Sequence, residues 1–338
     1  MYFMMLSKRL GIDLGTANSI VWLEGAGVVI NEPTVVAVLM DSGQVVAVGN
    51  EAKQMLGRTP GNIYASRPLR EGVIADYEIT EKILKYFIQK ALGKTMFFRP
   101  EVMVCVPAGC TQVERRAVID ATLSAGAGKA WLIEEPLAAA IGAGIPIEML
   151  SGNMVVDIGG GATEAAVISM GGVVVHKAAR VAGNKIDEAI AAWVRRKHNL
   201  IIGEQTAEEV KLKIGSALPI AKEETLEVKG RNSISGLPKN VVVSSTEVTE
   251  AIRPVLALIL GAIKAVLEET PPELSSDIID KGVILSGGTS QLRGFDKYVT
   301  EEIGVPAHVA EEPMLCVIKG IGVTLENFAL YQRTISQR

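Results

Sequence analysis

An aspartate followed by a glycine-rich turn is the part of the sequence best suited to chemistry. The segment 155–167 consists of an apolar run that contains Asp157, three consecutive glycines and a second apolar run. Short runs rich in Val and Ala are typical of strands, so the glycines are expected in a tight turn between two strands. Backbone N–H groups that converge in such a turn bind anions, usually phosphate. An Asp beside polyphosphate implies Mg²⁺ between them, although a glycine-rich hairpin with a solvated Asp has the same pattern.

The same pattern occurs near the N-terminus, in the segment 10–22. There Asp13 lies in an apolar run and is followed by a turn that carries glycine, hydroxyl and amide groups. Asp13 aligns with Asp157, and Gly15 aligns with Gly159. Similarity at such long spacing indicates two related halves rather than a solenoid, whose repeat is much shorter. Two turns that each supply backbone donors and one carboxylate can hold a triphosphate from both sides.

A third glycine-containing segment, 282–292, reads as a strand that ends in Gly287 and Gly288, followed by a helix. Glycines at that point would allow a base or a ribose to lie against the backbone. Together with the two turns, this segment predicts a nucleotide site built from three separate parts of the chain.

These three segments resemble the phosphate 1, phosphate 2 and adenosine motifs of the actin, heat-shock chaperone and sugar-kinase superfamily. Within it, the sequence is similar to the MreB-type bacterial actins, the cell shape-determining proteins of rod-shaped cells. The similarity extends over nearly the whole chain and rests on segments 11–18, 31–33, 67–69, 72–77, 133–136, 151–157 and 270–274. The resemblance implies an α/β actin-like ATPase fold, with two duplicated RNase H-like halves and a nucleotide cleft between them.

Each half is expected to carry a small inserted subdomain. The first half would comprise residues 1–145 and the C-terminal helical segment 314–338, with its subdomain at about 32–66. The second half would comprise residues 146–313, with its subdomain at about 181–243.

The resemblance also implies the residues of the site. ATP or ADP would bind in the cleft with Mg²⁺, which Asp13 and Asp157 would hold largely through water. Glu135 corresponds to the acid that positions the attacking water, as in other phosphoryl-transfer sites. The residues expected to act in hydrolysis are Glu135, Asp13, Asp157 and Thr163. The residues expected to contact the nucleotide are Gly15, Thr16, Ala17, Asn18, Gly159, Gly160, Gly161, Gly183, Glu208, Glu209, Lys211, Gly287, Gly288, Thr289 and Ser290.

Some of these acids have a simpler alternative explanation. Two acids at a helix N-terminus are favoured by the helix dipole, which accounts for Glu134. Glu208, Glu209 and Lys211 would also be ordinary charges on the surface of a helix.

One departure from the family pattern bears on hydrolysis. The family usually has two threonines after the three glycines, whereas this chain has Ala162 and Thr163. The missing hydroxyl would lie where a donor can position water or the terminal phosphate. We therefore expect nucleotide binding to be preserved and hydrolysis to be slowed. Asn184, where Asp is usual, and Thr289, where Gly is usual, are smaller departures.

Composition excludes several classes of protein. Lys and Arg number 34 against 38 Asp and Glu, and no basic block stands out, which argues against nucleic acid as a partner. Three Cys and three His are too few and too scattered for a disulfide framework or a metal cluster, and this fits a reducing cytoplasm. The longest apolar run, 254–263, is too short to span a bilayer.

Two apolar segments are candidates for membrane contact. Met96, Phe97 and Phe98 lie between two cationic residues, and large apolar residues in a loop mark either a contact surface or a loop folded back on its helix. Members of the resembling family bind membrane through a hydrophobic loop in this region. The N-terminal segment 1–6 is apolar and is followed by Lys8 and Arg9, so it could lie on a membrane surface or be a frayed strand.

The resemblance implies an ATP-dependent, filament-forming protein and a slow ATPase coupled to polymerisation. Such a protein associates with itself and with the anionic inner face of the cytoplasmic membrane, so it is cytoplasmic and peripheral. There it organises cell-wall synthesis with membrane proteins of the MreC, MreD and RodZ type. A small-molecule kinase of the same superfamily is the alternative, but it would need an acceptor pocket in a larger insertion.

Overall fold

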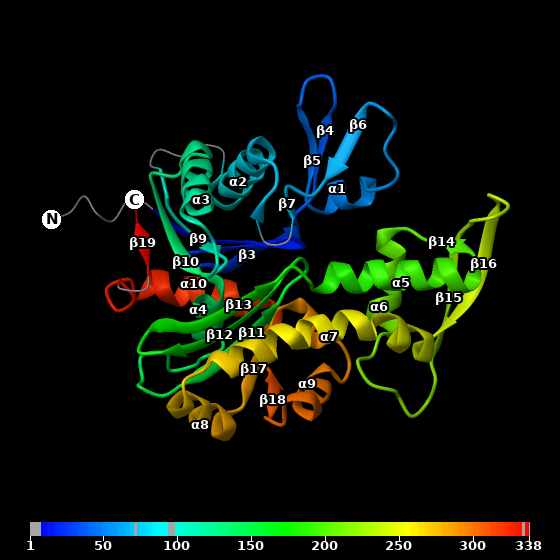
Figure 1. Ribbon diagram of the computed structural model, residues 1–338. Coiled ribbons are helices and arrows are strands. Elements are labelled where there is room, and N and C mark those ends of the chain that lie inside the picture. The colour runs from blue at the N-terminus through cyan, green and yellow to red at the C-terminus, as the bar shows by residue number, and fades with distance from the viewer. Residues whose placement is uncertain (1–7, 71–72, 94–98, 333–334, 338) are drawn as a thin grey trace.

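Two β-sheets rich in Val, Ile and Ala form the centre of the computed structural model, which describes residues 8–70, 73–93, 99–332 and 335–337 (Figure 1). The first sheet has the strand order β19-β10-β9-β1-β2-β3. Its strands are β1 (Arg9–Leu14), β2 (Asn18–Leu23), β3 (Gly27–Pro33), β9 (Glu101–Val106), β10 (Lys129–Glu134) and β19 (Ser336–Gln337). β1 pairs antiparallel with β2 and parallel with β9.

The second sheet repeats this arrangement in the order β13-β12-β11-β17-β18. Its strands are β11 (Asn153–Ile158), β12 (Thr163–Ser169), β13 (Gly172–Ala179), β17 (Val283–Ser286) and β18 (Ala307–Val309). β11 pairs antiparallel with β12 and parallel with β17. Asp13 and Asp157 therefore lie on equivalent strands, β1 and β11, each followed by a hairpin.

Helices cover both faces of each sheet (Figure 1). On the outer face of the first sheet are α2 (Tyr77–Leu92) and α3 (Gln112–Ser124). Between the sheets are α4 (Glu135–Gly142) and α10 (Cys316–Glu326), where Leu137, Val155 and Ile321 belong to one buried cluster. On the second sheet lie α7 (Ser245–Glu269), α8 (Pro272–Lys281) and α9 (Phe295–Ile303). Burial of one such aliphatic side chain contributes about 1.5–3 kcal/mol.

The helices begin where the sequence supplies a cap and an apolar face. The Asp76 side chain accepts a hydrogen bond from the N–H of Ile79 at the start of α2. Ile83 and Phe87 of this helix are fully buried against the first sheet. α3 begins at a capping box in which Thr111 and Glu114 bond each other's backbone N–H groups.

A small three-stranded sheet belongs to each half. In the first half it consists of β4 (Val36–Leu39), β5 (Val45–Val48) and β6 (Ile63–Ser66), with α1 (Asn50–Met55). In the second it consists of β14 (Leu200–Ile201), β15 (Thr225–Asn232) and β16 (Pro238–Ser244), with α5 (Gly183–His198) and α6 (Glu204–Ile214). The remaining short elements are β7 (Leu69–Arg70), β8 (Val73–Ile74) and the 3₁₀ helices η2 (Gly288–Gln291) and η3 (Pro313–Leu315).

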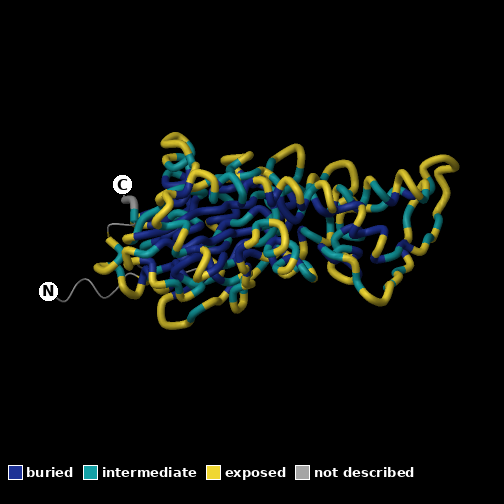
Figure 2. The backbone as a smooth tube through the Cα atoms, turned by 60° about the horizontal axis from the view of Figure 1, so that its bottom comes forward, coloured by how far each residue is buried: buried dark blue, intermediate teal, exposed yellow. Residues whose placement is uncertain are grey.

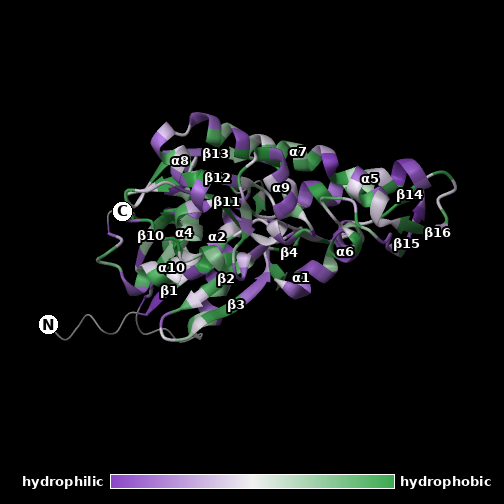
Figure 3. Cartoon of the chain, turned by 90° about the horizontal axis from the view of Figure 1, so that it is seen from below, coloured by the Kyte–Doolittle hydropathy of each residue, from purple (hydrophilic) through white to green (hydrophobic). Residues whose placement is uncertain are grey.

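Buried backbone is concentrated in the two large sheets, whereas the β15–β16 hairpin is mostly exposed (Figure 2). The hydropathy colouring shows the same division, with apolar residues on the central strands and on α4 and α10 (Figure 3). The domain boundaries given above stay predictions, because the sheets alone do not fix where one domain ends. Within the described ranges, no helix is both long and apolar enough to cross a membrane.

The two central helices, α4 and α10, cross at glycines. A Cβ atom at Gly142 would lie 1.8 Å from the carbonyl oxygen of Cys316, and one at Gly320 would lie 1.8 Å from that of Ala138. Both neighbours are backbone atoms, so a side chain at either glycine forces the helices apart. Both helices pack between the two sheets, so the spacing at their crossing sets how the halves meet.

We predict that Gly320→Ala destabilises the protein by about 1–3 kcal/mol, since overpacking at a backbone contact moves whole elements. Chemical unfolding measures this change. Gly261→Ala is the matched control: Gly261 is an exposed residue of α7, and a Cβ there would meet nothing within 4 Å. That variant is expected to be unchanged or more stable by up to about 1 kcal/mol, because Ala is the better helix former. Equal effects at both sites would contradict the close helix crossing.

Candidate functional site

The two glycine turns meet across the space between the halves. The first follows β1 at residues 15–17 and the second follows β11 at residues 159–162. A Cβ atom at Gly160 would lie 2.5 Å from the Cβ of Ala17, and one at Gly161 would lie 2.6 Å from the Thr16 hydroxyl. Only glycine allows this approach, so Gly160 and Gly161 serve the contact between the turns as well as any ligand.

Residues of α5 and η2 donate hydrogen bonds to the carbonyl groups of the second turn. The N–H of Gly183 donates to the Gly159 carbonyl at 3.2 Å, and the N–H of Asn184 donates to the Gly160 carbonyl at 2.8 Å. The Thr289 hydroxyl donates to the same Gly159 carbonyl at 2.7 Å. The structure thus brings together the second turn, the start of α5 and the η2 segment. Each of these carries residues that the sequence predicts to contact the nucleotide.

Asp13 and Asp157 lie beneath the two turns. The Cys105 thiol donates to Asp13 Oδ1 at 3.2 Å, and the Ser286 hydroxyl donates to Asp157 Oδ1 at 2.7 Å. Burial raises the pKa of Asp13 to about 7; the bond from Cys105 lowers this pKa and the charge of Asp157 raises it. Burial also raises the pKa of Asp157, while the bond from Ser286 lowers it. Two acids placed this way favour a cation or a phosphate-bound metal between them.

Glu135 is the first residue of α4 and is half-buried. Its pKa is raised well above the usual value by burial first, then by the charges of Glu164, Asp13 and Asp157. Glu134 differs, because its carboxylate forms an ion pair with Arg115 at 2.6 Å. The structure therefore separates the two adjacent acids: one is neutralised within the first half, and the other lies among the acids of the cleft.

Glu164 is a site residue that sequence reasoning missed. It lies on β12 directly opposite Asp157 of β11 and is 3% exposed. Burial raises its pKa to about 8; the hydrogen bond from the N–H of Ala108 lowers this pKa, and the charges of Asp157 and Glu134 raise it. The available signal was one acid in an otherwise uncharged buried strand, Thr163–Ser169.

Thr163, the remaining residue predicted to act in hydrolysis, uses its hydroxyl in a hydrogen bond to the backbone. It is fully buried, and its hydroxyl donates to the carbonyl of Val181 at 2.6 Å. This bond fixes β12 to the chain that enters α5. With this hydroxyl engaged and Ala162 in the turn before it, residues 162 and 163 offer no further hydroxyl to a phosphate.

Lys211, one of the residues predicted to contact the adenosine, bonds to the start of α5, which supports the second turn. Its ammonium group contacts Asp187 at 2.9 Å and donates to the Gly183 carbonyl at 3.3 Å. Burial raises the pKa of Asp187 to about 6, although the charge of Lys211 lowers it. Ser290 is buried and its hydroxyl donates to the Gly287 carbonyl at 2.7 Å, which holds the glycine pair in place.

Glu208 and Glu209 are adjacent on α6 but have different partners. Glu208 forms an ion pair at 2.7 Å with Lys53, which lies on α1 in the small subdomain of the other half. Glu209 pairs with Lys213 of its own helix at 2.6 Å. Sequence reasoning did not anticipate the contact between the small subdomains. Arg67 and Glu204 add a second ion pair between the same two parts of the chain.

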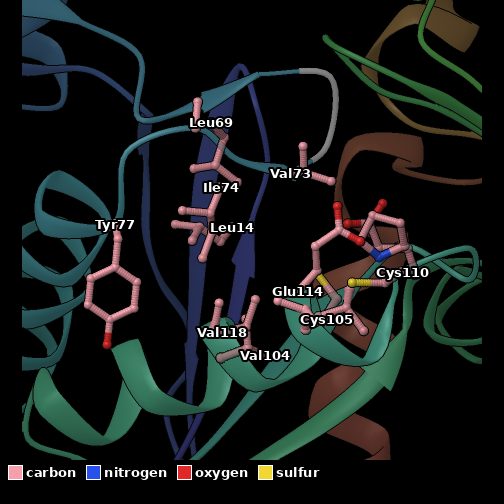
Figure 4. Close-up of a pocket in the computed structure, with 16 residues that line it drawn as sticks. Leu14, Leu69, Val73, Ile74, Tyr77, Val104, Cys105, Cys110, Glu114 and Val118 are labelled. Atoms are coloured by element: carbon pink, nitrogen blue, oxygen red, sulfur yellow. The ribbon is translucent and has the colours of Figure 1, made fainter.

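A cavity of about 280 Å³ lies beside Glu135, within the first half. Figure 4 shows Leu14, Leu69, Val104 and Val118 around it, on strands of the first half and on α3. Its lining is mostly apolar, and Glu114 and Glu135 are the acidic residues in it.

Two predictions, the membrane contact and the magnesium ligands, are not tested by the residues that the structure describes. Met96, Phe97 and Phe98, predicted to contact membrane, lie outside the described residues, as does the segment 1–6. Within the described ranges, no three His, Cys, Asp or Glu side chains gather closely enough to hold a metal ion by themselves. Asp13 and Asp157 as water-mediated Mg²⁺ ligands therefore stay a prediction.

Solved structures share this arrangement. MreB5 of Spiroplasma citri bound to AMPPNP superimposes with a TM-score of 0.92 at 35% identity, over 97% of this chain and 98% of its own. A chain titled MamK double helical filament gives a TM-score of 0.79 over 95% of this chain and 99% of its own. At 21% identity, that likeness shows the fold alone. The chain thus has the predicted α/β fold of the actin-like proteins.

The sequence comparisons identify a narrower group than the shared fold does. The family model described as MreB/Mbl protein matches residues 7–333. The cell shape-determining protein Mbl of Bacillus cereus is 51% identical over 323 residues, which are 96% of this chain and 97% of that protein. The cell shape-determining protein MreB of Escherichia coli is 51% identical over 328 residues, which are 95% and 94% of the two chains. The chain belongs to the MreB/Mbl family.

We predict that Glu208→Gln speeds nucleotide release about 2- to 5-fold, because a partly exposed ion pair contributes about 0.5–1 kcal/mol and this one joins the two halves. Glu302→Gln is the control, because it removes an exposed ion pair with Lys264 that lies within the second half, and its release rate is expected to be unchanged. Stopped-flow release of a fluorescent ADP measures both. If the two variants release nucleotide equally fast, the contact between the small subdomains does not hold the cleft closed.

Proposed function

We propose that this protein is an ATP-dependent, filament-forming bacterial actin that acts at the inner face of the cytoplasmic membrane. The observation that carries the proposal is the pair of glycine turns that meet above Asp13 and Asp157. Further support comes from MreB5 of Spiroplasma citri, which is solved with AMPPNP and with ADP, at 35% and 36% identity to this chain. The kinase alternative is not favoured, because the chain belongs to the MreB/Mbl family.

The residues present fit a nucleotide with a divalent cation. Asp13, Asp157, Glu135 and Glu164 all have raised pKa values, first of all because they are buried, and their charges act on one another. A magnesium ion would supply positive charge to this group of acids and to the phosphates. Asp13 and Asp157 would hold it, largely through water.

The chain's own groups have separate tasks in this proposal. The two turns bind the phosphates through backbone N–H groups, and the glycines keep both turns close. Lys211 and the glycine pair 287–288 flank the adenosine. Glu135 orients the water that attacks the terminal phosphate. Because both halves hold one nucleotide, its phosphorylation state can change the angle between them.

The geometry of exposed apolar side chains supports self-association. Ile234 and Leu237, in the tip of the β15–β16 hairpin, are 81% and 65% exposed. Leu150 and Met170, near the opposite end of the second half, are 77% and 70% exposed. Figure 1 shows this hairpin and the β12–β13 turn at opposite ends of the molecule. An apolar surface at each end suits a heterologous, head-to-tail contact, which extends without closing.

Sedimentation tests this self-association. We expect the wild-type protein to pellet with ATP and Mg²⁺, whereas a small-molecule kinase would stay in the supernatant. Ile234→Asp combined with Leu237→Asp should remove most of the pellet, since a charge in an apolar contact is costly to desolvate. Leu258→Asp, at an exposed position of α7, is the control and should pellet normally. A wild-type protein that never pellets would refute the filament proposal.

The same assay with anionic vesicles examines the membrane part of the proposal. The wild-type protein is expected to co-sediment with lipid through Met96–Phe98, the N-terminal segment or both. Removal of residues 1–6 together with Phe97→Ser and Phe98→Ser should abolish lipid binding. Co-sedimentation that survives all these changes would eliminate both segments as membrane contacts. Partners of the MreC, MreD and RodZ type, and the organisation of cell-wall synthesis, follow from the family resemblance.

We predict that Ala162→Thr accelerates hydrolysis, because it restores a hydroxyl donor beside the phosphate site. One such contact contributes about 1–3 kcal/mol when its partner would otherwise be unpaired, which corresponds to roughly 5- to 160-fold in rate. Single-turnover ATPase measurements report the change, with ATP affinity measured in parallel. An unchanged rate removes this explanation of Ala162.

A further inference from the structure

One oxygen of Glu164 is buried without a partner. Oε2 accepts a hydrogen bond from the N–H of Ala108 at 3.2 Å, whereas Oε1 has no hydrogen-bond partner among the residues that the structure describes. The whole residue is 3% exposed. A buried carboxylate oxygen that lacks a partner costs free energy, and such groups persist at functional sites where a ligand satisfies them.

The position of Glu164 directs its side chain toward the nucleotide cleft. Residues that face each other in an antiparallel pair project from the same side of the sheet, and Glu164 lies directly opposite Asp157. The hydrogen bond from the N–H of Ala108 joins this side chain to the loop that follows β9 in the first half. Glu164 therefore bridges the halves on the face where Asp157 lies.

The surroundings of Glu164 differ from those of a structural ion pair. The charged groups that act on it are the acids Asp157 and Glu134, and its own charge acts on Glu135 more strongly than those of Asp13 and Asp157 do. Glu134 by contrast has Arg115 as its partner. Within the described part of the chain, the N–H of Ala108 is the one contact that favours a negative charge on Glu164, and it reaches only Oε2. An external hydrogen-bond donor to Oε1 therefore explains the acid better than internal packing does.

We propose that Glu164 is a second water-positioning residue, whose unpartnered oxygen accepts a hydrogen bond from the water that also contacts Glu135. This inference rests on the proposed function, since it requires ATP in the cleft. Two acceptors fix both hydrogens of the water, so that the remaining lone pair of its oxygen is directed at the terminal phosphate.

The step balances without any further reactant. The water oxygen forms a bond to the terminal phosphorus, and the bond from that phosphorus to the β–γ bridging oxygen breaks. The electron pair of the broken bond stays on ADP. One proton of the water stays on the inorganic phosphate, and the other is released to solvent.

Glu164→Gln tests the role with little change in shape. The amide oxygen can keep the bond from Ala108, and the NH₂ group then replaces Oε1, so a donor faces the water where an acceptor is needed. We expect single-turnover hydrolysis to fall about 10- to 100-fold at saturating Mg²⁺, while the affinities for ATP and ADP change less than about 3-fold. The thermal midpoint of the nucleotide-free protein is expected to stay the same or rise.

Two comparisons separate positioning from a structural effect. Glu247→Gln changes a buried acid that does have partners, Lys197 and His198, and should lower the thermal midpoint without slowing hydrolysis. In the double variant Glu135→Gln, Glu164→Gln, the loss should be no larger than that of the slower single variant, because both residues act on one water.

Three results would overturn the inference. The first is normal hydrolysis by Glu164→Gln at saturating Mg²⁺, and the second is a loss in the double variant equal to the product of the single losses. The third is a lowered thermal midpoint together with weakened nucleotide binding, which would make Glu164 a structural residue. If the wild-type protein bound no ATP, the proposed function itself would fail. If ATP bound and Glu135→Gln alone slowed hydrolysis, only the role of Glu164 would fail.

Discussion

The close approach of the two glycine turns is the constraint on which the rest of the structure depends. Gly160 and Gly161 bring the second turn within contact of Ala17 and Thr16, and no residue with a side chain fits at either glycine without moving backbone. This contact places Asp13 and Asp157 on facing sides of one site. It also means that whatever binds there is held by both halves, and neither half can bind it alone in the same way.

Two further contacts maintain this approach, and one group of residues opposes it. The crossing of α4 and α10 at Gly142 and Gly320 sets the distance between the sheets at the centre. The ion pair between Lys53 and Glu208 joins the small subdomains above the turns. The acids below the turns act in the opposite sense, because their mutual repulsion and burial are unfavourable until a cation or a hydrogen-bond donor is present. A ligand that relieves this repulsion therefore couples its own binding to the angle between the halves.

The sequence predicted the two Asp–glycine turns from local patterns that occur in both halves, and it predicted the fold through the family resemblance that these patterns support. It did not predict Glu164, whose significance depends on being opposite Asp157 and in contact with a loop more than fifty residues away. Nor did it separate Glu208 from Glu209, which differ only in the direction each side chain takes from one helix. The sequence predicts that Thr163 acts in hydrolysis, and only the folded structure shows its hydroxyl bonded to the carbonyl of Val181. Contacts between distant segments are thus what the sequence pattern could not supply.

The most direct test is an experimental structure of the protein with Mg²⁺ and a non-hydrolysable ATP analogue. The triphosphate is expected between residues 15–18 and 159–162, with the metal within one water of Asp13 and Asp157. A triphosphate bound outside the contact between the two turns, or held by one half only, would contradict the account at its centre.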